Sequence, residues 1–212
     1  MTRLIVSLSV LVRGIALCGF VSIAAMAEAY QIAPEAACLS RLTTAADTII
    51  DGEVLSAESV YLPSPSGGQL PATRYTFHVN AAFKGDATVE ETLTVDQFGW
   101  RKAPAGERVR IPPLGASYAV GGRYVLFLYG KSELGLQNAV GFNYGRFTVS
   151  SAPDGRLTVQ NGVDNVGLTA CGETADTALS ARRAPLERIA VQSREGGAIA
   201  YDTFIAAMAA VK

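Results

Sequence analysis

Residues 38–60 read CLSRLTTAADTIIDGEVLSAESV, and the apolar pattern changes its period within this stretch. Up to Ala46 the apolar residues follow a weak helical spacing, which predicts one or two helical turns within 34–46. From Thr48 the period is two, with Gly52 on the apolar face and the acidic residues Asp51 and Glu53 on the other. The stretch therefore predicts a short helix that leads into a first β-strand.

Gly52 lies in the middle of this predicted strand. A glycine at such a position usually marks a β-bulge, a bend or a close approach of two backbones. Strands of a closed barrel must also coil sharply at such points. We therefore expect the first strand to curl at Gly52.

Further alternating segments follow at short, nearly regular intervals, with turn signals and no helical pattern between them. A turn-rich stretch at 62–69 and a long loop at 98–122 separate some of them. This pattern predicts an antiparallel barrel or sandwich. The expected strands are 74–81, 88–96, 123–129, 142–150 and 156–160, with a weaker strand signal at 109–111.

The last part of the chain changes to a helical period. A first helix is predicted at 185–191, and a glycine pair at 196–197 ends it. A second helix follows with Asp202 as its expected N-cap. We expect its apolar stripe to pack on the β-domain, the alternative being a partner-binding helix. The stripe consists of Tyr201, Phe204, Ile205 and Met208.

Residues 1–27 have the pattern of a secretory signal peptide. Arg3 and Arg13 precede an apolar run that ends in the small-x-small sequence at 25–27, and a cut two residues later is the second option. A membrane anchor is the alternative interpretation of the same run. The signal predicts export to the periplasm or the extracellular space, with no membrane attachment after cleavage.

The charge balance argues against a nucleic-acid partner. The chain has 18 basic and 19 acidic residues, and removal of the signal peptide takes away two of the basic ones. The mature chain is therefore slightly acidic and has no general attraction to nucleic acid or to an anionic surface. We expect a monomer.

Cleavage also removes Cys18 and leaves Cys38 and Cys171. Two cysteines in an oxidising compartment predict one disulfide, which would fasten the start of the fold to the end of its β region. A reactive thiol is the alternative, but no CxxC spacing supports it.

The order of short motifs resembles a family of exported bacterial proteins with an OB-like barrel, related to tissue inhibitors of metalloproteinases and to netrin-like modules. Those motifs are Ala46-Asp47 before the first strand, Phe83-Lys84-Gly85 after the second, and the run 122–128. The resemblance spans about 38–160 and implies the fold. In the metalloproteinase inhibitors a cysteine at the mature N-terminus chelates the protease zinc. Cys38 is the one matching position, and the predicted cleavage leaves residues ahead of it.

Together these signals divide the chain into four parts. Residues 1–27 form the signal peptide and residues 28–47 an N-terminal segment with Cys38. Residues 48–170 form the mainly β, antiparallel OB-like barrel. Residues 171–212 form a helical tail that packs on the barrel.

Groups with catalytic potential are scarce. The chain has one histidine, His78, on the polar face of its strand, and neither a GxSxG elbow nor an HExxH pair. No catalytic residue, metal ligand or cofactor is therefore predicted. Asp164 with Asn161 and Asn165 is the best local cluster for calcium, but it matches no EF-hand loop.

The segment 97–110 is the strongest candidate for ligand binding. It holds the only tryptophan of the chain among several cations, and OB-type barrels bind oligomers through aromatic and cationic groups in such loops. The alternative is a solvated loop whose tryptophan covers one end of the barrel. The candidate residues are Trp100, Arg101, Lys102, Arg108 and Arg110.

From these observations we expect an exported, non-catalytic binding module whose partner is a protein or a cell-envelope polymer. A protease-inhibitor-like protein and a hydrolase with a carboxylate-based site are the alternatives.

Overall fold

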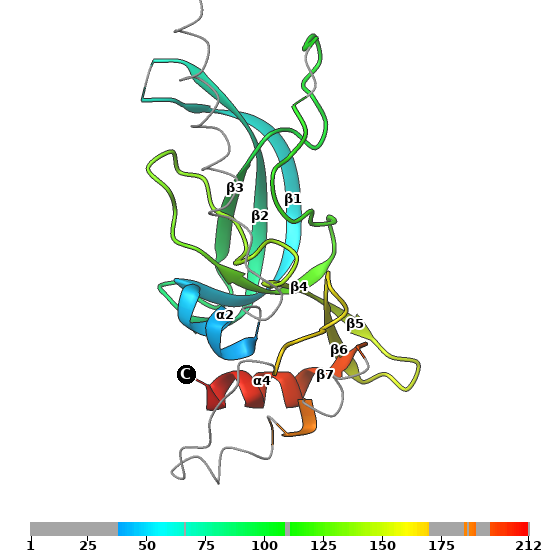
Figure 1. The fold of residues 1–212 in the computed structure, drawn as a ribbon. Coiled ribbons are helices and arrows are strands. Elements are labelled where there is room, and N and C mark those ends of the chain that lie inside the picture. Colours follow the sequence, from blue (N-terminus) through cyan, green and yellow to red (C-terminus); the bar gives the residue numbers. More distant parts are fainter. Residues whose placement is uncertain are drawn as a thin grey trace, which may run out of the picture. The chain divides into compact units, whose positions relative to one another are not determined.

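The structure is a computed structural model, and it describes residues 38–65, 67–108, 111–169, 185, 187–189 and 196–211. Seven strands form one antiparallel sheet in the order β3-β2-β1-β4-β5-β6-β7 (Figure 1). The predicted mainly β class is confirmed. The strands are β1 (Thr48–Pro63), β2 (Gln69–Lys84), β3 (Thr92–Phe98), β4 (Arg123–Leu128), β5 (Arg146–Ser151), β6 (Leu157–Asn161) and β7 (Ile199–Ala200), and the helices are α2 (Leu39–Ala45) and α4 (Tyr201–Ala210).

The sheet does not close into the predicted barrel. Among the described residues, β3 and β7 are its two edges and do not pair with each other. The segment 137–140 lies between β3 and β4 instead. Gln137 N–H donates to Asp96 O of β3 over 2.8 Å, and Val140 N–H donates to Phe127 O of β4 over 2.7 Å. This segment forms an isolated bridge with the end of β4 and no full strand, so the two sides of the sheet are connected by a few backbone hydrogen bonds and not by a continuous ladder.

The main core is the inner face of β1 to β4, and a cluster of aromatic rings occupies its centre. The fully buried ring of Tyr118 packs edge-on against Tyr75, Phe77 and Tyr124, with ring centroids 4.9, 5.2 and 5.5 Å apart. Such edge-to-face pairs contribute about 0.5–1.5 kcal/mol each beyond the area that they bury. The loop residue Tyr118 therefore fills the space between strands.

A second apolar cluster fixes the C-terminal helix. Phe204 of α4 lies 4.6 Å from the Phe147 ring and 6.3 Å from the Phe127 ring. Figure 1 shows α4 and α2 at the end of the sheet where β5, β6 and β7 lie. Phe204 and Met208 are buried within the fold, and Phe204 contacts rings of β4 and β5. The prediction that this stripe packs on the β-domain is therefore confirmed.

Gly52 marks an irregularity in β1, as its position in the strand pattern predicts. The register between β1 and β2 shifts between Asp51 and Gly52. A Cβ atom at Gly52 would lie 2.9 Å from the carbonyl oxygen of His78 and 3.2 Å from Ile50 Cδ1. Glycine is therefore required here because the two backbones approach too closely for a side chain.

We expect Gly52→Ala to lower the free energy of unfolding by about 1–3 kcal/mol, the usual cost of overpacking, because a backbone carbonyl cannot move aside. Urea denaturation of the purified variant measures this loss. Gly68→Ala is the matched control, since no atom lies within 4 Å of its added Cβ. Equal stability of the two variants would contradict the close-approach explanation.

Two predicted strands begin later than their alternation suggests. Residues 88–91 form a turn before β3, in which Glu90 has a φ of 67°, and residues 142–145 form a turn before β5, in which Phe142 has a φ of 55°. Both residues leave the extended region of the backbone, which an alternating side-chain pattern does not reveal. The strand predicted at 109–111 lies mostly outside the described residues.

The helices agree with the predictions more closely in place than in detail. The helical turns expected within 34–46 correspond to α2, and the last helix begins at Tyr201. The N-cap is Ala200 and not Asp202, which lies in the first turn. An acidic side chain there still favours the helix through its interaction with the macrodipole. Of the helix predicted at 185–191, only Pro185 and residues 187–189 are described, and all four are helical.

The chain returns to the start of the fold after β6. The N–H of Leu39 donates to Leu168 O over 2.8 Å, and the neighbouring Cys38 is buried. Leu168 precedes Cys171 by three positions, so the described part of this return is compatible with the predicted Cys38–Cys171 bond. Cys171 itself lies outside the described residues, as does the predicted signal peptide 1–27.

We therefore expect Cys38→Ser to lower the free energy of unfolding by about 2–3 kcal/mol, within the usual range for losing a disulfide. Reductant should lower the melting temperature of the native protein and leave that of the variant unchanged. Titration of two free thiols per mature chain under native-preparation conditions would contradict the predicted bond.

Candidate functional site

The most strongly paired charged group of the described chain is Asp51, which is fully buried in β1. Arg123 of β4 holds both of its carboxylate oxygens, with Nε at 2.8 Å and Nη2 at 2.7 Å. The hydroxyl of Tyr201 in α4 donates to the same carboxylate over 2.5 Å, and the Asn80 amide lies 3.4 Å away. Four elements of the fold therefore meet at one carboxylate.

These contacts change the titration of the partners of Asp51. The hydrogen bond to Asp51 raises the pKa of Arg123 above its ordinary value. Burial, followed by the hydrogen bond to Asp51, raises the pKa of Tyr201. Arg123 thus stays charged and Tyr201 stays a neutral donor at any physiological pH. With donors on both of its oxygens, the Asp51 carboxylate is suited to fixing α4 on the sheet and not to proton transfer.

Asp51 and Glu53 share one face of β1, as the alternation predicts, because they pair in unbroken register with Val125 and Arg123 of β4. Glu53 is exposed, whereas Asp51 is buried because α4 covers this part of β1.

The predicted ligand-binding segment presents its cations but not its tryptophan. Trp100 is 3% exposed; its indole N–H donates to Val60 O over 3.2 Å, and its ring meets the Tyr61 ring edge-on at 5.1 Å. A ring buried in this way offers no face to a ligand. Trp100 is therefore a packing residue on the β1–β2 hairpin, which is the alternative interpretation of this segment.

The cations of this segment do not converge on one place. Arg101, Lys102 and Arg108 are exposed, and Arg110 lies outside the described residues. The Arg101 guanidinium donates to Tyr118 O, and the Lys102 carbonyl accepts from the Ser59 hydroxyl. These contacts attach the segment to the hairpin and the core.

A pocket lies at another place, at the end of the sheet where β2 turns toward β3. Its volume is about 400 Å³, at the small end of the range for small-molecule sites. We call it the end pocket. Three apolar residues contribute to its wall: Val79, Ala87 and Leu93. Its polar lining consists of Thr48, Thr88, Thr92, Asp86, Glu91, Lys131 and Gln137.

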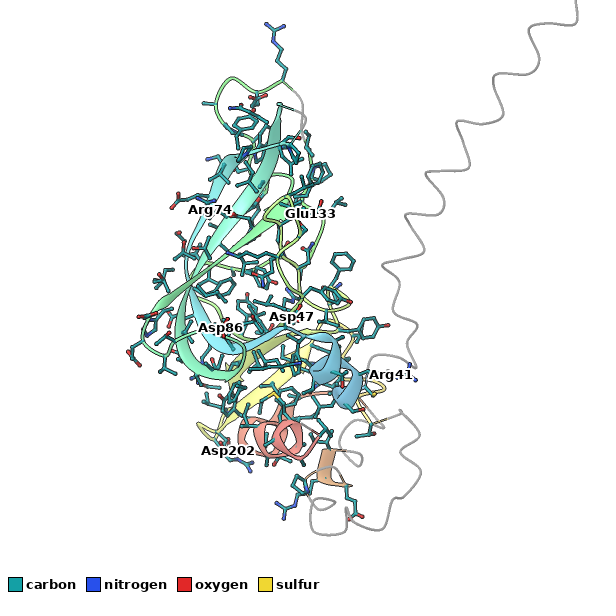
Figure 2. The ribbon with its side chains drawn as sticks, turned by 90° about the vertical axis from the view of Figure 1, so that its left-hand side faces the viewer. Arg41, Asp47, Arg74, Asp86, Glu133 and Asp202 are labelled. Carbon is teal, nitrogen blue, oxygen red and sulfur yellow. The ribbon has the colours of Figure 1, made fainter. Side chains whose placement is uncertain are left out.

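Two of the short sequence motifs build this end of the fold. Gly85, with a φ of 85°, lies so close to β1 that a Cβ atom there would be 2.8 Å from Asp47 O and 2.9 Å from Thr48 Oγ1. The ammonium group of Lys84 donates to Thr43 O over 2.9 Å. The Ala46-Asp47 pair and the Lys84-Gly85 pair thus meet across the β1–β2 hairpin. Figure 2 shows Asp47 and Asp86 in this region.

The charged groups of the end pocket form no salt bridges with one another in the described chain. Asp86, Glu91 and Lys131 are exposed and take part in none of the salt bridges found among the described residues. Gln137 is 5% exposed; its Nε2 donates to Tyr129 O over 2.7 Å, while its Oε1 has no hydrogen-bond partner. The end pocket therefore combines available acceptors, one available cation and adaptable hydroxyls.

The candidate calcium cluster is a hydrogen-bonded turn. Asn161 Oδ1 accepts from the backbone N–H groups of Val163 and Asn165 over 3.1 and 2.7 Å. Asn165 Nδ2 donates to Val159 O and Gly197 O over 2.9 and 2.7 Å. The Asn161 side-chain oxygen is therefore already occupied by two backbone donors. The Asn165 amide joins β6 to the segment before α4. The described residues contain no group of three or more metal-ligating side chains.

Within the described part of the chain, His78 forms one ion pair. Its Nε2 lies 3.5 Å from the Glu90 carboxylate, and both side chains reach solvent. Because both groups are accessible to water, this arrangement has the geometry of a surface ion pair and not of a catalytic dyad.

Cys38 does not present its backbone or sulfur to a metal outside the protein. The residue is 1% exposed, and its sulfur lies 3.3 Å from the Ser40 hydroxyl. The zinc-chelating role that the resemblance suggests requires an accessible N-terminal cysteine, and a buried one does not supply it.

No protein-family model matches the chain, and no curated protein matches it. In the described part of the chain, no helix is both long enough and apolar enough to cross a membrane.

The sequence does not predict the end pocket, because its lining comes from four separate segments. The Lys84-Gly85 turn was the available signal, since it fixes Asp86 at the end of β2.

Proposed function

We propose that the chain is an exported, non-catalytic binding module on an OB-like scaffold and that the end pocket holds its ligand. The observation that carries this proposal is a pocket of about 400 Å³ whose charged groups make no salt bridge among the described residues. Export rests on the signal-peptide pattern of 1–27. An OB-like arrangement is supported by the segment 137–140, whose backbone bonds to both β3 and β4.

The end pocket replaces the cationic segment around Arg101 as the candidate ligand site. The sequence predicts that this segment binds a protein or an envelope polymer. Burial of Trp100 removes the aromatic platform from that site. The end pocket has room for a small polar molecule or the end of a polymer, and its acidic groups do not favour a polyanion.

A hydrolase is the second candidate, because the end pocket contains two carboxylates, Asp86 and Glu91. Paired carboxylates are the usual machinery of glycoside hydrolysis. The structure exposes both side chains to solvent, whereas the general acid of such an enzyme is typically held in a buried, apolar environment. Non-catalytic binding is therefore the better-supported function.

Turnover assays separate the two candidates. We expect the purified mature protein to show no turnover of chromogenic glycoside, ester or peptide substrates above a buffer control. If turnover is seen, the double variant Asp86→Asn/Glu91→Gln decides its origin. Turnover that disappears in this variant and persists in Glu133→Gln would establish a carboxylate hydrolase and overturn the binding proposal.

A further inference from the structure

We propose that the end pocket binds a small zwitterion, a compound with an ammonium group and a carboxylate a few bonds apart, such as a free amino acid or a short peptide. This inference rests on the proposed function and adds a ligand class to it. In the proposed complex, the ammonium group is held by Asp86 and Glu91 and the carboxylate by Lys131.

The acceptors of the pocket favour an ammonium group. Asp86 and Glu91 both line it, and neither has a cationic partner within salt-bridge distance in the described chain. Hydrogen bonds between a charged donor and a carboxylate are roughly twice as strong as neutral ones. A ligand ammonium group would supply the ion-pair partner that these two carboxylates lack in the described chain.

Gln137 gives independent support for a donor ligand. It lines the end pocket, and it is 5% exposed with an Oε1 that has no hydrogen-bond partner. The hydrogen bond from Nε2 to Tyr129 O fixes which way the amide faces. A buried acceptor left without a donor costs about 1–3 kcal/mol. A ligand donor that reaches Oε1 would recover part of that cost.

Lys131 distinguishes a zwitterion from a simple cation. It is the only cationic side chain among the lining residues of the end pocket. A ligand with an ammonium group alone would leave Lys131 unpaired and feel its repulsion, whereas a carboxylate on the same ligand turns this group into a contact. The threonine hydroxyls can donate or accept and so suit either end of the ligand.

The test uses four probes added to the mature ¹⁵N-labelled protein: L-alanyl-L-alanine, its N-acetyl form, its C-terminal amide, and methyl glucoside as a neutral polar compound. Amide chemical shifts of Ala87, Leu93 and Gly130 report occupancy of the pocket. We expect the free dipeptide to shift these amides, and each blocked form to bind about tenfold more weakly or worse, which corresponds to about 1.4 kcal/mol.

Variants assign the two ends of the ligand. Glu91→Gln should weaken the free dipeptide about tenfold. Lys131→Gln should remove the difference in affinity between the free dipeptide and its amide, an effect that a purely structural role of Lys131 would not produce. Glu133→Gln is the matched control, since Figure 2 shows Glu133 well apart from Asp86; it should bind like the wild type.

The outcomes separate this inference from the proposed function. If the acetylated dipeptide or methyl glucoside shifts the pocket amides as strongly as the free dipeptide, the zwitterion is wrong and the end pocket remains the ligand site. If no probe shifts these amides at millimolar concentration, both the zwitterion and its site are overturned.

Discussion

Replacing Asp51 with alanine is expected to lower the free energy of unfolding by about 3–4 kcal/mol, because it leaves the Arg123 guanidinium and the Tyr201 hydroxyl without their shared acceptor. The lower part of the usual range for a broken buried pair applies, since the Arg123 side chain is 35% exposed and can regain water. Chemical denaturation monitored by circular dichroism measures the loss.

Asp154→Asn is the matched control for Asp51. Asp154 also pairs with an arginine, at 2.6 Å from Arg156, but both side chains are largely in solvent. Exposed pairs contribute little to stability, so this variant should have the same melting temperature as the wild type. A similar melting temperature for the Asp51 and Asp154 variants would show that the buried network does not hold the fold together.

The second large effect is expected for Phe204→Ala. This side chain is fully buried between α4 and the strands β4 and β5, in contact with two aromatic rings. Removal of a buried phenylalanine costs about 3–5 kcal/mol through lost burial and the cavity left behind. The same denaturation experiment measures it.

Ile205→Ala serves as the control on the same helix, because Ile205 is only partly buried. We expect it to lose clearly less stability than Phe204→Ala. If both variants lost little, α4 would contribute little to the folded state, and neither the Phe204 packing nor the Tyr201 hydrogen bond would explain how the tail is held.

The alternating side-chain pattern was sufficient to predict the mainly β class, most strand positions and the irregularity at Gly52. Each of these depends on residues close together in the chain. The alternating pattern predicts that Glu90 and Phe142 lie in strands, but both lie in turns and have a positive φ. Side-chain alternation contains no information on the sign of φ.

The buried network and the end pocket depend on residues far apart in the chain. Asp51 and Tyr201 are separated by 150 positions, so no local pattern could show that α4 would cover one acid of β1. The alternation correctly places Asp51 and Glu53 on one face of β1, but it does not show that the contact with Tyr201 of α4 buries the first of them. Long-range pairing, and not local propensity, decides which polar groups are buried.

Trp100 shows the same limit from the other side. A lone tryptophan among cations in a long loop indicates either a binding platform or a packing residue. Its indole N–H bond to Val60 O and its contact with Tyr61 decide for packing. Both partners lie about 40 residues earlier in the chain, where the sequence gives no sign of the contact.

The central claim is that the end pocket, and not the Trp100 segment, is the ligand site. Amide chemical-shift mapping of the ¹⁵N-labelled protein against a library of small polar compounds tests it most directly. We predict that the compounds that bind shift the amides of Ala87, Leu93 and Gly130 and leave those of Arg101, Lys102 and Arg108 unchanged. Shifts confined to the Arg101–Arg108 amides would contradict the claim.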